Sequence, residues 1–161
     1  MTKKTLNIAI IGSGFMGKAH SNAWLKVSKF FDVDYDIRLK AIAGNNTPIE
    51  AFAERWGYEE LTYDWRSIME RSDIDVVDIV TPPYLHKEMA LAALEAGKHV
   101  ICEKPFALTY SDALELEQAA KKAGVLHYLN HNYRRVPAVT LAKQLVDEGR
   151  LGQIFHWRGA Y

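Results

Sequence analysis

The sequence predicts an α/β fold, built as a doubly wound parallel sheet. Two observations carry this prediction. Apolar, strand-like runs alternate with amphipathic helical patterns along the 161 residues. The first such run is followed by Gly12, Gly14 and Gly17 in the spacing G-x-G-x-x-G. With right-handed crossovers, such a chain forms a sheet covered by helices on both faces, and ligands bind at the carboxyl ends of its strands.

Each element follows from its own pattern. Short β-branched runs predict buried strands, and apolar residues at i, i+3, i+4 and i+7 predict helices. Thr47 and Pro48 are typical of a helix start, and glycines end several helices. In chain order we expect a strand at 6–11, a helix at 15–29, a strand at 37–44, a helix from 48 to 56, a strand at 61–63, a short helix at 64–71, a strand at 74–80, a helix at 84–96, a strand at 99–103, a helix at 110–123, a strand at 126–130, a helix at 137–148 and a final strand at 152–161.

The three glycines have distinct expected roles. Gly12 makes a tight turn, Gly14 leaves room for a pyrophosphate against bare backbone, and Gly17 lets the helix pack close to the strand. The amino terminus of the helix then offers unpaired N–H groups and a partial positive charge to the phosphates. The alternative is a glycine-rich turn without a ligand. The strand before the loop and the helix after it favour a dinucleotide site in a Rossmann fold.

The end of the second strand bears on the choice of cofactor. NAD sites usually carry Asp or Glu here for the ribose 2′-hydroxyl, whereas this chain reads Gly44-Asn45-Asn46. No carboxylate repels a 2′-phosphate and no arginine attracts one, and Asn45 can hydrogen-bond either ribose form. We expect NAD as the cofactor, with NADP as the alternative.

Composition excludes several function classes. Twenty basic residues balance 20 acidic ones, so a nucleic-acid partner is not expected. No apolar run approaches the ~20 residues that span a bilayer, and the amino-terminal run ends in glycines rather than in a cleavage site. The single cysteine, Cys102, excludes an intrachain disulfide and predicts a reducing, cytoplasmic location. No metal-ligand spacing and no nucleophile–base pair is present.

The segment VICEKPFAL at 100–108 narrows the choice of protein family, because it places Lys104 where a strand ends. Three further segments accompany it: GSGFMGKAH, IDVVDIVTPPYLHKEMALAALEAGKHV and NHNYRRVPA. With them the chain resembles, over nearly its whole length, the glucose–fructose oxidoreductase, inositol dehydrogenase and rhizopine-catabolism family (Gfo/Idh/MocA).

The resemblance implies a set of cofactor contacts and one catalytic group. Lys104 is the implied catalytic residue, and the bond before Pro105 is expected to be cis. Physically, an ammonium there stabilises a developing alkoxide and relays its proton during hydride transfer; the structural alternative is a lysine at a strand end. The implied cofactor-binding residues are Gly12, Gly14, Phe15, Met16, Gly17, Thr81, Pro82, His86, Glu103, Lys104, Asn130 and Asn132, to which the strand pattern adds Asn45.

His20 has no implied role. It lies in the helix at 15–29, whose expected inward face is Met16, Ala19, Ala23 and Val27. Packing and function are equally open for this histidine.

Family members have a second, α+β domain that supplies the general base and most of the sugar-binding wall. No counterpart is expected here, so we expect one dinucleotide-binding domain over 1–161, with its core at about 5–130. The chain then belongs to a dehydrogenase acting on a sugar or an inositol-like polyol, truncated and weakly active or inactive alone. The strand at 152–161 leaves an open edge, which predicts a homodimer. A non-catalytic dinucleotide-binding module and a structural, dimerising module are the alternatives.

Overall fold

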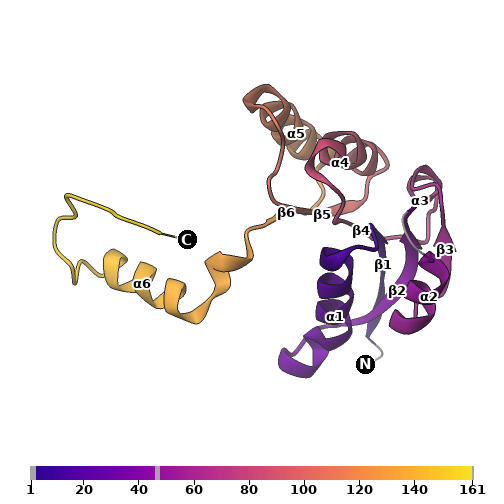
Figure 1. Ribbon diagram of the computed structural model, residues 1–161, viewed down its shortest axis with the longest axis horizontal. Helices are drawn as coiled ribbons and strands as arrows, with labels where there is room; N and C mark the ends of the chain where they lie inside the picture. The colour runs from indigo at the N-terminus through magenta and orange to yellow at the C-terminus, as the bar shows by residue number, and fades with distance from the viewer. Residues whose placement is uncertain (1–2, 46–47, 161) are drawn as a thin grey trace. The chain divides into compact units, whose positions relative to one another are not determined.

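The sheet has the strand order of a dinucleotide-binding fold. The computed structural model describes residues 3–45 and 48–160. Its six parallel strands run in the order β3-β2-β1-β4-β5-β6 (Figure 1). The order reverses between β1 and β4, and ligands of open α/β sheets bind at this switch point. The strands are β1 (Lys4–Ile11), β2 (Tyr35–Ala43), β3 (Glu60–Thr62), β4 (Val76–Ile79), β5 (His99–Glu103) and β6 (His127–Asn130). The predicted fold class is confirmed.

Helices cover both faces of the sheet and enclose two apolar clusters. One cluster joins the sheet to α1 and α2, and the other joins it to α3, α4 and α5. The helices are α1 (Phe15–Phe30), α2 (Ile49–Trp56), α3 (Arg66–Met69), α4 (His86–Glu95), α5 (Tyr110–Ala123) and α6 (Pro137–Asp147), with 3-10 turns η1 (Pro83–Leu85) and η2 (Asn132–Arg135). Thr47, the expected cap of α2, lies outside the described residues.

The carboxyl half of β1, Ile8 to Ile11, is apolar and buried. Successive side chains of a strand point to opposite faces, so Ile8 and Ile10 enter the α1/α2 cluster while Ala9 and Ile11 enter the other. Where helices cover both faces of a central strand, both sets of side chains are buried, which favours apolar residues at successive positions.

The inward face of α1 differs from the expected one. Gly17, His20 and Ser21 are buried, whereas Ala23 is exposed. The two polar side chains are tolerated because each has partners. The Ser21 hydroxyl donates to the Gly17 carbonyl oxygen at 2.7 Å and lies 2.8 Å from the Tyr58 hydroxyl.

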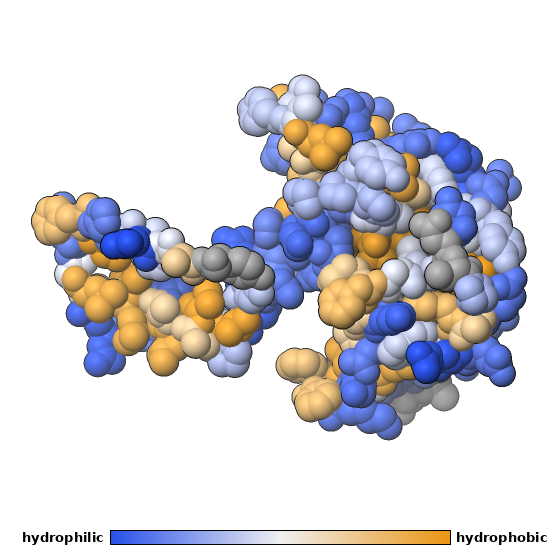
Figure 2. Space-filling view, viewed as in Figure 1, coloured by the Kyte–Doolittle hydropathy of each residue, from blue (hydrophilic) through white to orange (hydrophobic). Residues whose placement is uncertain are grey.

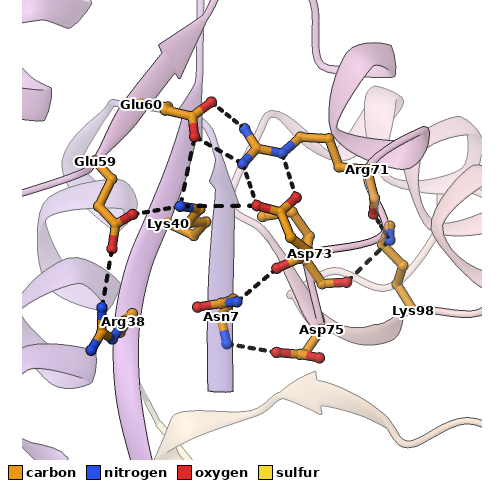
Figure 3. A network of polar contacts seen from close by, with 10 residues as sticks. Asn7, Arg38, Lys40, Glu59, Glu60, Arg71, Asp73, Asp75 and Lys98 are labelled. Atoms are coloured by element: carbon orange, nitrogen blue, oxygen red, sulfur yellow. Dashed lines mark hydrogen bonds and ion pairs between the residues drawn. The ribbon is translucent and has the colours of Figure 1, made fainter. Parts of the chain in front are cut away.

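Charged side chains fasten the amino-terminal edge of the sheet, opposite the ligand edge (Figure 3). The Arg71 guanidinium bonds both Glu60 and Asp73, and Lys40 pairs with Glu59. Hydrogen bonds from Arg71 lower the pKa of Asp73 to about 2. These pairs join β2 and β3 to the segment that enters β4.

The chain divides into two compact units, one ending at Asn130 and one starting at His131. The second unit contains η2 and α6, and Figure 2 shows apolar side chains gathered on it; the exposed ones include Val139, Leu141 and Val146. The final strand predicted at 152–161 is wrong: no strand is present over 152–160. An alternating pattern forms a strand only when another strand accepts its backbone hydrogen bonds, and none is present among residues 131–160.

Within the described residues, no helix combines the length and apolarity needed to cross a bilayer. Within the same residues, no group of three or more His, Cys, Asp or Glu side chains could hold a metal ion.

Candidate functional site

A cavity of about 1180 Å³ opens at the carboxyl edge of the sheet, at the switch point between β1 and β4. Its floor is the glycine loop and the strand ends, and aromatic rings of Tyr63, Trp65 and Tyr84 form part of its wall. Of the predicted cofactor-binding residues, those that line it are Gly12, Gly14, Phe15, Met16, Asn45, Thr81 and Pro82. The structure thus brings together residues from three separate turns.

Two of the three glycines are required by the protein itself. Gly12 has a φ of +119°, and a Cβ on it would lie 3.0 Å from the Val80 carbonyl oxygen. A Cβ on Gly17 would collide with the carbonyl oxygen of Gly12. Gly12 therefore makes the turn and Gly17 permits the close approach of α1.

Gly14 is different, because among the residues that the structure describes no atom beyond its chain neighbours lies within 4 Å of the Cβ it lacks. Its φ of −74° is open to any residue. Neither packing nor backbone conformation explains a glycine here. Open space above a bare amide backbone is what a phosphate group needs to approach.

The cavity is electrostatically suited to an anion. Lys18 and Arg55 line it, and no carboxylate appears among its described lining residues. α1 begins at Phe15 beside the cavity, and its N-cap, Gly14, makes no side-chain capping bond. The first-turn amides of a helix have no intrahelical acceptor and carry partial positive charge. A diphosphate fits this end of the cavity.

The described residues that directly follow β2, Gly44 and Asn45, are uncharged. Gly44 follows β2, and a Cβ there would lie 3.1 Å from the Ser13 hydroxyl oxygen. Asn45 is exposed and lines the cavity. The predicted contact of Asn45 with the ribose remains a prediction.

His86 links two loops at the carboxyl edge of the sheet. Its side chain is fully buried, with Nε2 2.8 Å from the Thr81 carbonyl oxygen and Nδ1 2.9 Å from that of Pro105. It therefore ties the loop after β4 to the loop after β5. His86 is not among the residues that line the cavity, and its predicted contact with the cofactor remains a prediction.

The Glu103-Lys104-Pro105 segment ends β5. Lys104 is exposed and does not line the cavity, and the Lys104–Pro105 peptide bond is cis, as expected. Glu103 is buried, and its carboxylate accepts hydrogen bonds from His20 Nε2 at 3.0 Å and from the Lys104 amide at 3.2 Å. Glu103 thus acts within the protein, behind the backbone of Lys104.

Asn130 and Asn132, predicted together, fall in different units. Asn130 ends β6 and donates through Nδ2 to Glu103 Oε1 at 2.5 Å. Asn132 begins η2 in the second unit. A direct cofactor contact by either residue remains a prediction.

A buried polar cluster around His20 is the feature that sequence reasoning missed. The imidazole lies between Asp78, in the middle of β4, and Glu103. Burial lowers the pKa of His20, but hydrogen bonds and charges of Asp78 and Glu103 outweigh this and raise it. The signal that could have found the cluster is the carboxylate inside the apolar run VVDIV, since a buried charge needs a partner.

Cys102 carries no chemistry of its own. It is buried in β5, and burial raises the pKa of its thiol to about 12. The thiol therefore stays protonated at neutral pH and is a small packing group.

Comparison with known proteins identifies the family. The profile of the oxidoreductase family with an NAD-binding Rossmann fold (GFO_IDH_MocA) matches residues 6–131. The chain belongs to this family. Levoglucosan dehydrogenase of Pseudarthrobacter phenanthrenivorans is 48% identical over 160 residues, which are 98% of this chain and 41% of that enzyme.

Solved structures agree with this assignment. A levoglucosan dehydrogenase in complex with NADH superposes with a TM-score of 0.88 at 47% identity, over 93% of this chain and 41% of that one. Apo scyllo-inositol dehydrogenase from Lactobacillus casei gives a TM-score of 0.83 at 31% identity, over 94% and 44% of the two chains. This chain thus spans about two fifths of its relatives and holds their NAD-binding Rossmann domain. The predictions of the family and of NAD as cofactor are confirmed.

Proposed function

We propose that this domain serves the transfer of hydride between nicotinamide and a CH–OH group of a sugar or an inositol-like cyclic polyol. The observation that carries the proposal is the open space above the Gly14 backbone, at the carboxyl edge of the same sheet in which Lys104 directly follows β5. The 48% identity to a levoglucosan dehydrogenase makes an anhydrosugar our first choice of substrate.

Most of the site residues bind the dinucleotide, and Lys104 takes part in the chemistry. The first-turn amides of α1 and the side chain of Lys18 hold the pyrophosphate. Asn45 hydrogen-bonds the adenosine ribose. Thr81 and Pro82 line the wall of the cavity that the dinucleotide crosses.

Lys104 acts on the reacting hydroxyl. When bound, the nicotinamide accepts the hydride that leaves the carbinol carbon. The alcohol proton must leave as the carbonyl forms and passes to solvent water, while the Lys104 ammonium stabilises the developing alkoxide by donating a hydrogen bond to it. We therefore expect Lys104 to matter for turnover far more than for cofactor binding.

Titration calorimetry and a dehydrogenase assay test the proposal together. We expect micromolar NADH binding to the wild-type chain and to Lys104→Met, with Lys121→Met as the control. NAD reduction with levoglucosan, inositols or hexoses should be weak or undetectable, and Lys104→Met should abolish any that occurs. Failure of both NADH and NADPH to bind at millimolar concentration would overturn the proposal. Binding with turnover that Lys104→Met leaves intact would favour a different catalytic group.

We further propose a cytoplasmic location and self-association as a homodimer. The single, reduced cysteine supports the first, and the exposed apolar side chains of the second unit support the second. A monodisperse monomer in light scattering at micromolar concentration contradicts the homodimer.

A further inference from the structure

His20 occupies an unusual position for a histidine, between two buried carboxylates. Its Nδ1 lies 2.9 Å from Asp78 Oδ2, and its Nε2 lies 3.0 Å from Glu103 Oε1. The three side chains are 9%, 0% and 4% exposed. Asp78 also accepts a hydrogen bond from Trp24 Nε1 at 2.8 Å. Both ring nitrogens therefore have an assigned partner.

The two ends of this cluster lie beside the two working parts of the site. His20 is in the second turn of α1, whose first turn faces the cavity. Glu103 immediately precedes Lys104, and its Oε2 accepts the Lys104 amide at 3.2 Å. A continuous chain of hydrogen bonds thus runs from the phosphate-facing helix to the backbone of the lysine.

We propose that His20 is a positioning residue that couples dinucleotide binding at α1 to the placement of Lys104, through Glu103. The inference rests on the proposed function, since it assumes that the dinucleotide binds at the start of α1. A bound diphosphate restrains that end of the helix. Because His20 lies on the same helix, its hydrogen bond then restrains the Glu103 carboxylate, which in turn restrains the Lys104 amide. Coupling of this kind is reciprocal: what changes the Glu103 contact must change dinucleotide affinity.

The charges around His20 suit this role. The carboxylates facing it are Asp78 from β4 and Glu103 from β5, while Asn130 from β6 and Trp24 from α1 itself are neutral. Tyr58 and Cys102 lie near Asp78, and burial raises the pKa of both, so they stay neutral. A protonated His20 offsets the two carboxylates, which would otherwise repel each other.

Two substitutions separate positioning from simple packing. His20→Gln places an amide donor near the position of Nε2 and can still reach Glu103. His20→Asn places its donor near Nδ1, so it keeps Asp78 and loses Glu103. Both remove the ring and the charge, and a purely structural role predicts that both behave alike.

The readout is the backbone amide of Lys104 in ¹H–¹⁵N NMR spectra of the full chain, because that amide donates to Glu103. We expect His20→Asn to shift the Lys104 amide upfield and speed its hydrogen exchange, while His20→Gln leaves it near its wild-type position. By calorimetry, His20→Asn should weaken NADH binding at least about fivefold, the lower end of typical coupling between linked sites. His156→Asn, in the second unit, is the control and should change neither the Lys104 amide signal nor the affinity for NADH.

A measurement on the wild type keeps the inference testable if His20→Asn does not fold. Saturating NADH should shift the His20 imidazole signals and the Lys104 amide along one binding curve, and should leave the His156 signals unchanged. NADH binding without any shift at His20 or Lys104 would overturn the coupling and leave the proposed function standing. Absence of NADH binding would overturn the proposed function and with it the coupling. Equal effects of the two substitutions on the Lys104 amide would show that His20 contributes only to packing, which would overturn the proposed positioning role.

Discussion

Gly14 and Gly17 lie three residues apart in one loop, yet the structure predicts opposite outcomes when each is replaced by alanine. A Cβ on Gly17 meets the carbonyl oxygen of Gly12, a backbone atom that cannot move without opening the turn. Overpacking of this kind costs about 1–3 kcal/mol of folding free energy. A Cβ on Gly14 meets nothing within 4 Å, and at a compatible backbone conformation Gly→Ala stabilises a protein by about 0.4–1 kcal/mol.

Gly14→Ala should lose ligand affinity without losing stability. The methyl group of Gly14→Ala occupies the space through which a phosphate approaches the α1 amides. Loss of one charge-assisted hydrogen bond costs about 1.5–3 kcal/mol, which weakens binding by about 10- to 150-fold. Gly17→Ala should also weaken NADH binding, because it opens the turn at Gly12 that lines the cavity, but it should lose stability at the same time.

Urea unfolding and NADH titration of both variants measure the two effects separately. We expect Gly14→Ala to be at least as stable as the wild type and to bind NADH at least about tenfold more weakly. A Gly14→Ala chain that binds NADH with wild-type affinity would refute the reasoning, because the open space would then serve no phosphate. Loss of stability in this variant would show that the loop packs differently from the structure described.

Three further predictions concern other parts of the site and the sheet. His86→Phe removes the hydrogen bond that the buried ring donates to the Thr81 or the Pro105 carbonyl oxygen, so urea unfolding should show a loss of about 1–3 kcal/mol. Arg71→Gln should make the free energy of unfolding depend less on pH in the acid range. Hydrogen bonds from Arg71 lower the pKa of Asp73 to about 2, and the resulting stabilisation is present above about pH 4 and is lost as the pH falls toward 2. Between pH 5 and pH 2 the wild type should therefore lose more stability than the Arg71→Gln variant. Asn45→Asp should weaken NADPH binding at least about tenfold, because a carboxylate repels the 2′-phosphate, while NADH binding should change little.

The elements that local pattern defines were predictable. The buried parts of the central strands are mostly apolar because both faces are covered, and glycine ends helices at Gly57 and Gly124, both with positive φ. The family segments also located the loop of Gly12 to Gly17 and the cis bond before Pro105. Local sequence is sufficient for such features because each depends on neighbours along the chain.

Features that depend on contacts between distant residues were not predictable. His20 and Glu103 are 83 residues apart and meet only when α1 packs on the end of β5. The buried face of α1 is therefore only partly the expected one: Met16 packs on the core, but His20 and Ser21 are buried with polar partners while Ala23 is exposed. The strand expected at 152–161 failed for the same reason: its pattern is local, but a strand requires a partner from elsewhere.

The central claim is that a dinucleotide lies with its diphosphate on the amino terminus of α1 and its nicotinamide toward Lys104. A crystal structure of this chain with NADH tests it most directly. The account predicts phosphate oxygens within about 3 Å of the amides that open α1, with the Gly14 backbone directly beneath them and Lys104 on the nicotinamide side. A dinucleotide bound away from the Gly12–Gly17 loop, or a Lys104 side chain pointing away from the bound nicotinamide, would contradict it.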